Sequence, residues 1–290
     1  MSKRERDEIS GTETTGHTWD GLKELNTPLP RWWVWTFYVT IIWALGYSIV
    51  YPSWPLLTTN VKGLWNWSSR GDVAASLSAA QGAQKEWLDK INAADVNAIN
   101  ADEQLRNFAV AGGAAAFKVN CVQCHGSGAA GAVGYPNLND NDWLWGGSLD
   151  AIYTTIQHGI RSTDDGSTRD SAMPAFADGV LDATQIDQVA NYVLKLSGNE
   201  ADEAAATAGA QLFTDNCASC HGADGKGMRD FGAPNLTDSI WLRFDAPTKE
   251  NIVAQISKPH HGLMPAWAAK LDDATIKQLA VYVHSLGGGE

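Results

Sequence analysis

Cysteine and methionine are both scarce in this chain, which has four of each among its 290 residues. Four cysteines are too few for a disulfide-dense scaffold. Basic residues are also few, with 21 Lys and Arg against 33 Asp and Glu. The resulting net charge of -12 argues against a nucleic-acid partner, which would need a basic face. A hydrophobic fraction of 44% excludes a disordered chain, and the length suggests two domains.

Long apolar runs are lacking too, with one exception at residues 32–51, which carry no charge. A helix of this length spans about 30 Å, the thickness of a bilayer core. Tryptophans crowd one end and tyrosines the other, as expected for the two membrane interfaces, and Pro52 stops the helix. The run predicts a transmembrane helix over residues 32–52 rather than a buried core helix or a cleaved signal peptide.

The remainder of the chain contains an internal repeat. The run Asn-Cys-x-x-Cys-His-Gly occurs at residues 120–126 and again at 216–222. A Pro-Asn-Leu triplet, a Trp, a Met-Pro-Ala triplet and a final apolar-periodic segment follow each copy in the same order. Five shared landmarks indicate a duplicated domain. We place the copies at residues 108–198 and 199–290, after a linker over residues 53–107 that has helical stretches and a break near residue 70.

The two copies differ in one place, because the first carries about nine extra residues before its Met-Pro-Ala triplet, around residues 161–168. In both copies the final segment has apolar residues at i, i+3 and i+4, which predicts a helix. Asp182 is the expected N-cap of this helix in the first copy. No segment alternates strongly enough to predict a strand. The expected domains are therefore small, helical and rich in loops.

Cys-x-x-Cys-His is the attachment pattern of haem c, in which two thiols add to the porphyrin vinyl groups and the histidine ligates the iron. A single copy would leave a redox dithiol or half a zinc site open. Two copies in register, each followed by Met-Pro-Ala, favour two covalently bound haem c groups. The predicted attachment residues are Cys121, Cys124, Cys217 and Cys220, and the proximal iron ligands are His125 and His221.

Met173 and Met264 are the natural sixth ligands, because each begins a duplicated Met-Pro-Ala triplet. A His/Met pair fills both axial positions and leaves electron transfer as the task of the iron. Whether each methionine ligates the haem of its own copy or of the other is left open by the order of the residues. The backbone carbonyls of Pro136 and Pro234 are candidates to fix the two imidazole rings.

Four further histidines, His158, His260, His261 and His284, do not recur between the copies. His260 and His261 lie just before Met264 and could compete as ligands, although a surface position or a contact with a haem carboxylate is the simpler interpretation. His158 has no predicted role. The fold class that follows is all-α: a single N-terminal transmembrane helix and two tandem cytochrome c-like domains.

Haem c is attached on the extracytoplasmic side of bacterial membranes. This places residues 53–290 in the periplasm and residues 1–31 in the cytoplasm, with the helix as an uncleaved single-pass anchor in the inner membrane. Charge alone does not fix this orientation, because the basic residues near the two ends of the helix are equal in number.

With its anchor and two c-type domains, the chain resembles subunit III of cbb3-type cytochrome c oxidase. The most specific part of the resemblance is the run HTWDGLKELNTPLPRWW at residues 17–33. The resemblance covers essentially the whole chain, and residues 60–105 match least. It implies an electron-transfer subunit that is not an enzyme by itself. Electrons would come from cytochrome c or the bc1 complex and pass through the two haems to a mono-haem c subunit and the haem–copper catalytic subunit.

Two other functions remain open at this point. One is a dihaem subunit of a periplasmic dehydrogenase, against which the run at residues 17–33 speaks. The other is a dihaem peroxidase, which would need an open axial position on one iron, whereas both copies carry Met-Pro-Ala.

Overall fold

The computed structural model of the chain describes residues 5–290, which divide into two compact units that meet at residue 83. The first unit begins with an antiparallel hairpin of β1 (Thr14–Trp19) and β2 (Leu22–Leu25). Between them, Asp20 and Gly21 both adopt positive φ, 46° and 87°, as a tight hairpin turn requires. The sequence patterns predict no strand here. The Asp-Gly pair, which is typical of a hairpin turn, is the feature of the sequence that could have indicated it.

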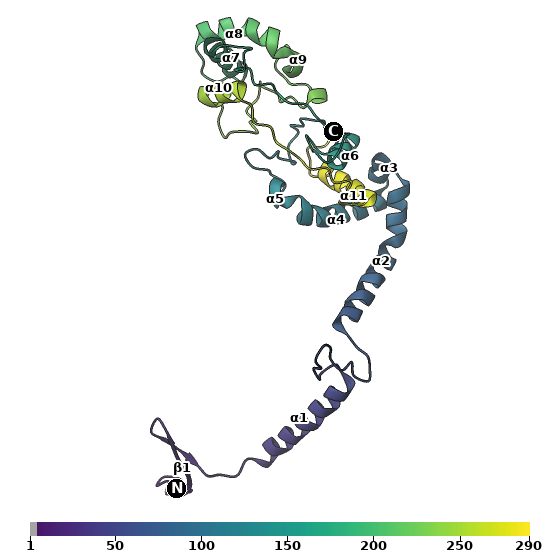
Figure 1. Cartoon of the computed structure of the whole chain (residues 1–290), viewed down its shortest axis with the longest axis vertical. Helices are drawn as coiled ribbons and strands as arrows, with labels where there is room; N and C mark the ends of the chain where they lie inside the picture. Colours follow the sequence, from purple (N-terminus) through teal and green to yellow (C-terminus); the bar gives the residue numbers. More distant parts are fainter. Residues whose placement is uncertain (1–4) are drawn as a thin grey trace. The chain divides into compact units, whose positions relative to one another are not determined.

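Helix α1 (Arg31–Val50) follows, and it confirms the predicted apolar helix (Figure 1). No side chain of α1 is buried, and the helix is long and apolar enough to cross a membrane. The hydroxyls of Thr36, Thr40 and Ser48 donate to backbone carbonyls of the same helix. Their polar groups are therefore satisfied without water, as a bilayer environment demands.

Three helices cover the segment predicted as a partly helical linker: α2 (Ser69–Ala93), α3 (Val96–Ala101) and α4 (Glu103–Asn120). The expected break near residue 70 is instead the start of α2, where the Ser68 hydroxyl accepts a hydrogen bond from the Gly71 N–H at 3.0 Å. Serine at this place is a favoured helix N-cap, which explains why a turn-like sequence opens a helix.

The rest of the second unit is helical, which confirms the all-α prediction apart from the N-terminal hairpin. Asp182 forms the predicted cap of α7, as part of a capping box with Gln185. The remaining elements are α5 (Val122–His125), α6 (Leu149–His158), α7 (Ala183–Leu196), α8 (Glu203–Asn216), α9 (Ala218–His221), a 3-10 turn (Arg229–Phe231), α10 (Lys249–Ser257) and α11 (Asp273–His284).

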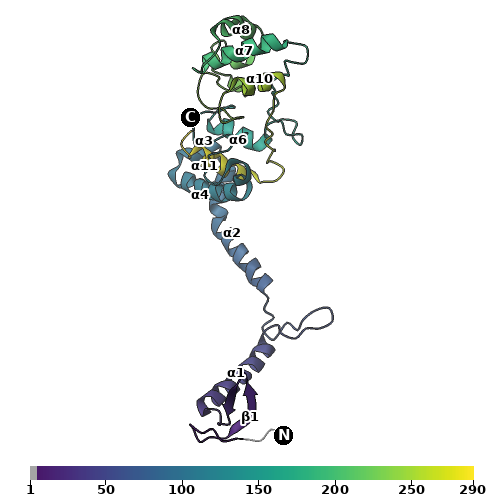
Figure 2. The ribbon, with the colours of Figure 1, turned by 90° about the vertical axis from the view of Figure 1, so that its left-hand side faces the viewer.

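These helices form two hydrophobic cores that do not coincide with the two sequence repeats. The first core joins α3, α4 and α6 to α11, the last helix of the second repeat. The second core joins α8 and α10 to α7, the last helix of the first repeat. Figures 1 and 2 both show α11 beside α4 and α7 beside α8. The final helices of the repeats are thus exchanged.

Each exchanged pair crosses at a glycine. A Cβ on Gly113 of α4 would lie 2.2 Å from the Gln278 carbonyl oxygen of α11, and a Cβ on Gly209 of α8 would lie 2.1 Å from the Gln188 carbonyl oxygen of α7. One helical turn further on, Phe117 packs on Tyr282 with ring centroids 5.4 Å apart, and the second pair repeats this contact at 5.2 Å. Both crossings therefore depend on glycine, which alone allows such close backbone approach.

Replacing Gly113 or Gly209 by Ala should destabilise the protein by about 1–3 kcal/mol, because the added methyl group would push the paired helices apart. Thermal and denaturant unfolding of the detergent-solubilised chain would measure this. Gly82 is the matched control: it lies within α2, and a Cβ added there would have no atom within 4 Å, so Gly82→Ala should leave stability unchanged or raise it. Equal effects at all three positions would contradict the close crossings.

Candidate functional site

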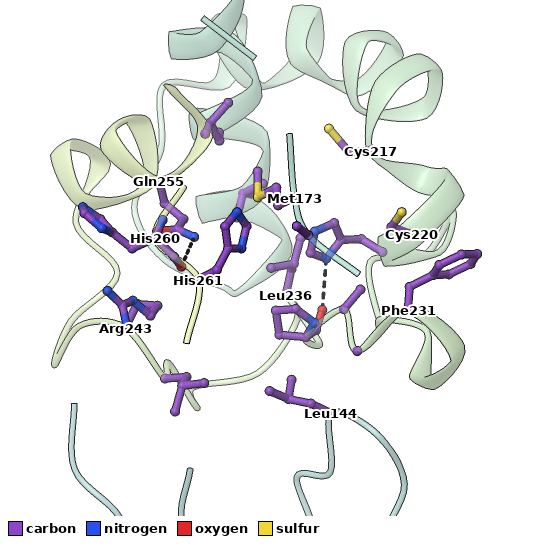
Figure 3. Close-up of a pocket in the computed structure, with 18 of the residues that line it drawn as sticks. Leu144, Met173, Cys217, Cys220, Phe231, Leu236, Arg243, Gln255, His260 and His261 are labelled. Atoms are coloured by element: carbon purple, nitrogen blue, oxygen red, sulfur yellow. Dashed lines mark hydrogen bonds between the residues drawn. The ribbon is translucent and has the colours of Figure 1, made fainter. Parts of the chain in front are cut away.

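The second Cys-x-x-Cys-His motif opens onto an apolar pocket within the second core. Cys217 caps the short helix α9, which carries Cys220 and His221. The pocket is lined by these three residues, by Met173 and by apolar side chains from four parts of the chain, among them Phe176, Val193, Phe213, Leu236, Ile252 and Ile256. Figure 3 shows Met173, Cys217 and Cys220 around this pocket. We call this group site 2.

The first motif has the same local structure. Cys121 caps the short helix α5, which carries Cys124 and His125. Cys121 packs against the first core, and so does Met264. We call this group site 1. All eight residues predicted to hold haem therefore fall into two groups, each with two cysteines, one histidine and one methionine.

The two methionines lie in the groups opposite to their positions in the sequence. Met173 belongs to the first repeat and lies in site 2, whereas Met264 belongs to the second repeat and packs with the core of site 1. This exchange follows from the exchange of α7 and α11, because each methionine precedes one of these helices. The structure thus groups each methionine with the Cys-x-x-Cys-His motif of the other repeat.

The predicted contacts from the two prolines are confirmed. The Nδ1 atom of His125 lies 3.1 Å from the Pro136 carbonyl oxygen, and Nδ1 of His221 lies 3.1 Å from that of Pro234. A carbonyl oxygen only accepts, so each imidazole carries its proton on Nδ1 and keeps Nε2 free for a metal. Burial lowers the pKa of both histidines, although the bond to the proline carbonyl opposes this shift. Burial therefore favours the neutral form of both rings.

The cysteines are free thiols rather than disulfides. Burial is the main cause that raises the pKa of Cys121 and of Cys217 to about 11, and the neighbouring cysteine of each motif adds to it. Such thiols are poor thiolate ligands and poor redox nucleophiles at neutral pH. No group of three or more His, Cys, Asp or Glu side chains suited to a metal ion occurs within residues 5–290. The raised pKa values of Cys121 and Cys217 speak against a redox dithiol.

A buried polar atom in site 2 fits a haem carboxylate. The indole Nε1 of Trp241, which lines the pocket, is buried without a hydrogen-bond partner. Such a donor is costly unless a bound group accepts from it. The equivalent residue of the first repeat, Trp143, donates instead to the Gly288 carbonyl oxygen. The residues of site 2 thus fit a haem whose carboxylate meets Trp241, and the two sites differ at this position.

The non-repeated histidines have separate surroundings. His260 and His261 line site 2 together with Met173 (Figure 3), and both are exposed, which agrees with the simpler interpretation of a surface position or a contact with a haem carboxylate. The ring of His158 pairs instead with the Asp165 carboxylate at 2.9 Å. Sequence analysis missed two basic residues of this pocket, Arg161 and Arg243, because neither recurs between the repeats.

One carboxyl group lies beside site 2. Asp142 precedes Trp143 and shares a polar cavity with Pro234 and Asn235 of site 2. Burial raises its pKa to about 6, and the nearby carboxylates of Asp140 and Asp238 contribute. Folding therefore raises the proton affinity of this group above that of an ordinary aspartate.

Between the ordinary pKa of 3.8 and about 6, the folded chain holds a proton on Asp142 that the unfolded chain releases. The contribution of this group to stability should therefore fall across this interval as pH rises. The side chain of Asn cannot ionise. The melting temperature of Asp142→Asn minus that of the wild type should therefore increase as pH rises to neutrality and stay constant above it. Asp178→Asn, at an exposed carboxylate, is the control. A difference between Asp142→Asn and wild type that does not change with pH would contradict the shifted pKa.

Comparison with known proteins agrees with this geometry. Residues 11–58 match the family described as the N-terminal domain of cytochrome oxidase-cbb3, FixP. Residues 108–193 and 204–283 match the family described as cytochrome C oxidase, cbb3-type, subunit III. These two matched segments are the two sequence repeats.

Curated relatives match over nearly the whole length of both chains. The cbb3-type cytochrome c oxidase subunit FixP of Rhizobium meliloti (strain 1021) is 56% identical over 284 residues, which is 98% of this chain and 97% of the relative. Subunit CcoP of Cereibacter sphaeroides is 54% identical over 278 residues, which is 96% of this chain and 95% of the relative. Subunit CcoP of Azospirillum sp. (strain B510) is 48% identical over the full length of both.

Proposed function

This chain belongs to the FixP and CcoP subunits of cbb3-type cytochrome c oxidase, and we propose that it holds two haem c groups whose methionine ligands are exchanged between its repeats. It is the membrane-anchored, haem-binding electron-transfer subunit of a terminal oxidase complex. Cys121, Cys124 and His125 hold the first haem, with Met264 as the sixth ligand. Cys217, Cys220 and His221 hold the second, with Met173.

Haem c supplies an iron that takes up and releases one electron. The residues of the chain fix the imidazoles through Pro136 and Pro234, surround the pocket with apolar side chains and supply a thioether to the remaining axial position. An iron held by both a histidine and a methionine would have no position left for oxygen or peroxide. The subunit therefore transfers electrons and leaves oxygen reduction to the catalytic subunit. A role in a periplasmic dehydrogenase or as a peroxidase has no support from the relatives.

We also propose a topology for the anchored chain. Helix α1 crosses the bacterial inner membrane once, with the N-terminal hairpin in the cytoplasm and the haem-binding unit in the periplasm. The support is chemical, because haem c is attached outside the cytoplasm and all eight haem-binding residues follow the helix in the sequence.

The proposed partners are the mono-haem c subunit and the haem–copper subunit as acceptors, and cytochrome c or the bc1 complex as donor. Residues 61–290 contain 16 Lys and Arg against 27 Asp and Glu. A negative field of this kind steers a basic protein toward the surface. The charge supports a soluble basic cytochrome c as the donor.

The second-order rate of electron uptake from a basic cytochrome c should fall steeply as salt rises. The cause is screening, since the Debye length shrinks from about 30 Å at 0.01 M to about 10 Å at 0.1 M. Stopped-flow reduction of the purified subunit would measure it, and an acidic cytochrome c of similar potential is the control, for which the rate should rise. Equal salt dependence for both donors would contradict steering by charge.

Single-haem variants test the exchanged ligands. In a chain with Cys217→Ala and Cys220→Ala, haem staining after denaturation should fall from two equivalents to one. In that background Met264→Ala should abolish the sulfur-to-iron charge-transfer band of the oxidised haem, whereas Met173→Ala should leave it intact, because Met264 packs in the core of site 1.

The reciprocal background, with Cys121→Ala and Cys124→Ala, provides the control with the opposite expectation. There Met173→Ala should abolish the band and Met264→Ala should not, because Met173 lies in site 2. The reverse pattern in either background would mean that each methionine ligates the haem of its own repeat.

A further inference from the structure

The extra residues of the first repeat lie in the loop between α6 and Met173. The guanidinium of Arg161 in this loop makes two hydrogen bonds, from Nε to the Gly262 carbonyl oxygen at 2.7 Å and from Nη1 to the Ser171 carbonyl oxygen at 2.6 Å. No carboxylate of the described chain forms a salt bridge with it. This half-buried cation is therefore held by backbone carbonyls.

The two carbonyls have equivalent places in the two repeats. Ser171 lies two residues before Met173, and Gly262 lies two residues before Met264. A single side chain thus joins the segment that delivers the methionine of site 2 to the segment that delivers the methionine of site 1. Nothing in the second repeat duplicates this bridge, because the loop before Met264 is shorter and has no equivalent of Arg161.

The backbone next to Arg161 is fixed to the same segment. Ile160 and Met264 exchange two backbone hydrogen bonds, of 2.9 and 3.0 Å. Gly159 makes room for this pairing, since a Cβ there would lie 2.4 Å from the Met264 carbonyl oxygen. Arg161 itself has a φ of 51°, in the left-handed region that a non-glycine residue adopts at a cost. The surrounding contacts hold the residue in this conformation.

We propose that Arg161 is a positioning residue shared by both haems, which holds Met173 and Met264 at their irons through one guanidinium. The inference rests on the exchanged ligation proposed above. A planar guanidinium can donate to two fixed carbonyls at once, whereas an ammonium on a flexible stem is a single point charge. Loss of Arg161 frees both methionine segments together, although it touches neither iron.

If Arg161 acted only as a charge within site 2, its replacement would have a different effect. Arg161 also lines site 2, where a cation could compensate a haem carboxylate. In that case its replacement would change the second haem only. An effect on both haems is therefore the observation that separates a shared clamp from a local charge.

The test uses the full-length, haem-loaded chain in the two single-haem backgrounds described above. Exogenous imidazole displaces a methionine ligand, and its apparent affinity rises with the fraction of time that the methionine is off the iron. Removing a charge-assisted hydrogen bond at each segment should raise imidazole affinity about tenfold in each background for Arg161→Gln. Arg161→Lys should give a smaller rise, again in both.

Arg169→Gln is the matched control. Arg169 lies in the same loop and is also half-buried, but its guanidinium donates to Thr155 and to the Ala151 carbonyl on α6 rather than to a methionine segment. Its replacement should leave imidazole affinity unchanged in both backgrounds. Met173→Ala and Met264→Ala in the same backgrounds report independently on whether the ligands are exchanged, so a failure of that premise is seen separately.

A rise in only one background would overturn the shared clamp in favour of a local role. Wild-type imidazole affinity for both Arg161 variants would overturn it altogether. Loss of covalent haem from both Arg161 variants, with Arg169→Gln intact, would also overturn it, because the residue would then act on folding rather than on the methionine segments.

Discussion

The close approach of helix backbones at Gly113 and Gly209 determines where the haem-binding residues lie. Each glycine admits a helix from the other repeat, and each admitted helix is preceded in the chain by a Met-Pro-Ala segment. Packing of α11 on α4 therefore carries Met264 to the first core, and packing of α7 on α8 carries Met173 to the second. The exchange of the two methionines between the cores is thus a consequence of helix packing.

The duplication does not make the two sites equivalent. Trp143 donates to a carbonyl of the protein, whereas its counterpart Trp241 keeps a buried donor free within the pocket. Arg161, His260 and His261 line site 2, so the polar groups of the pocket come from both repeats. Hydrogen bonds and charges near a haem are among the factors that set its potential. The structure therefore gives the two sites different electrostatic surroundings.

Much of the local structure could be predicted from the sequence, because its causes are local. The cap at Asp182, the end of α1 before Pro52 and the contacts of Pro136 and Pro234 with the histidines each depend on a few nearby residues. The hairpin at Asp20 was missed although its turn residues are typical. Two tandem repeats were predicted correctly as a sequence pattern, and the family comparison matches the same two segments.

The exchange of helices could not be predicted in this way, since α7 and α11 have similar apolar spacing and either could cover either core. The pairing depends on how the connecting loops cross. The feature of the sequence that relates to this crossing is the extra segment before Met173, which makes one loop longer than the other. Arg161 was missed for the same reason. Its partners, Ser171 and Gly262, lie in different repeats and come together only after the exchange.

The exchange also sets an order of assembly. The second core is built from a continuous stretch between α6 and α11, so all its helices and the cysteines of site 2 are synthesised before α11. The first core begins earlier in the chain but needs α11 to close it. The first Cys-x-x-Cys-His motif is thus synthesised first, whereas the core beside it is completed last. The segment that carries Cys121 and Cys124 therefore stays without its closing helix until α11 has been synthesised and packed on α4.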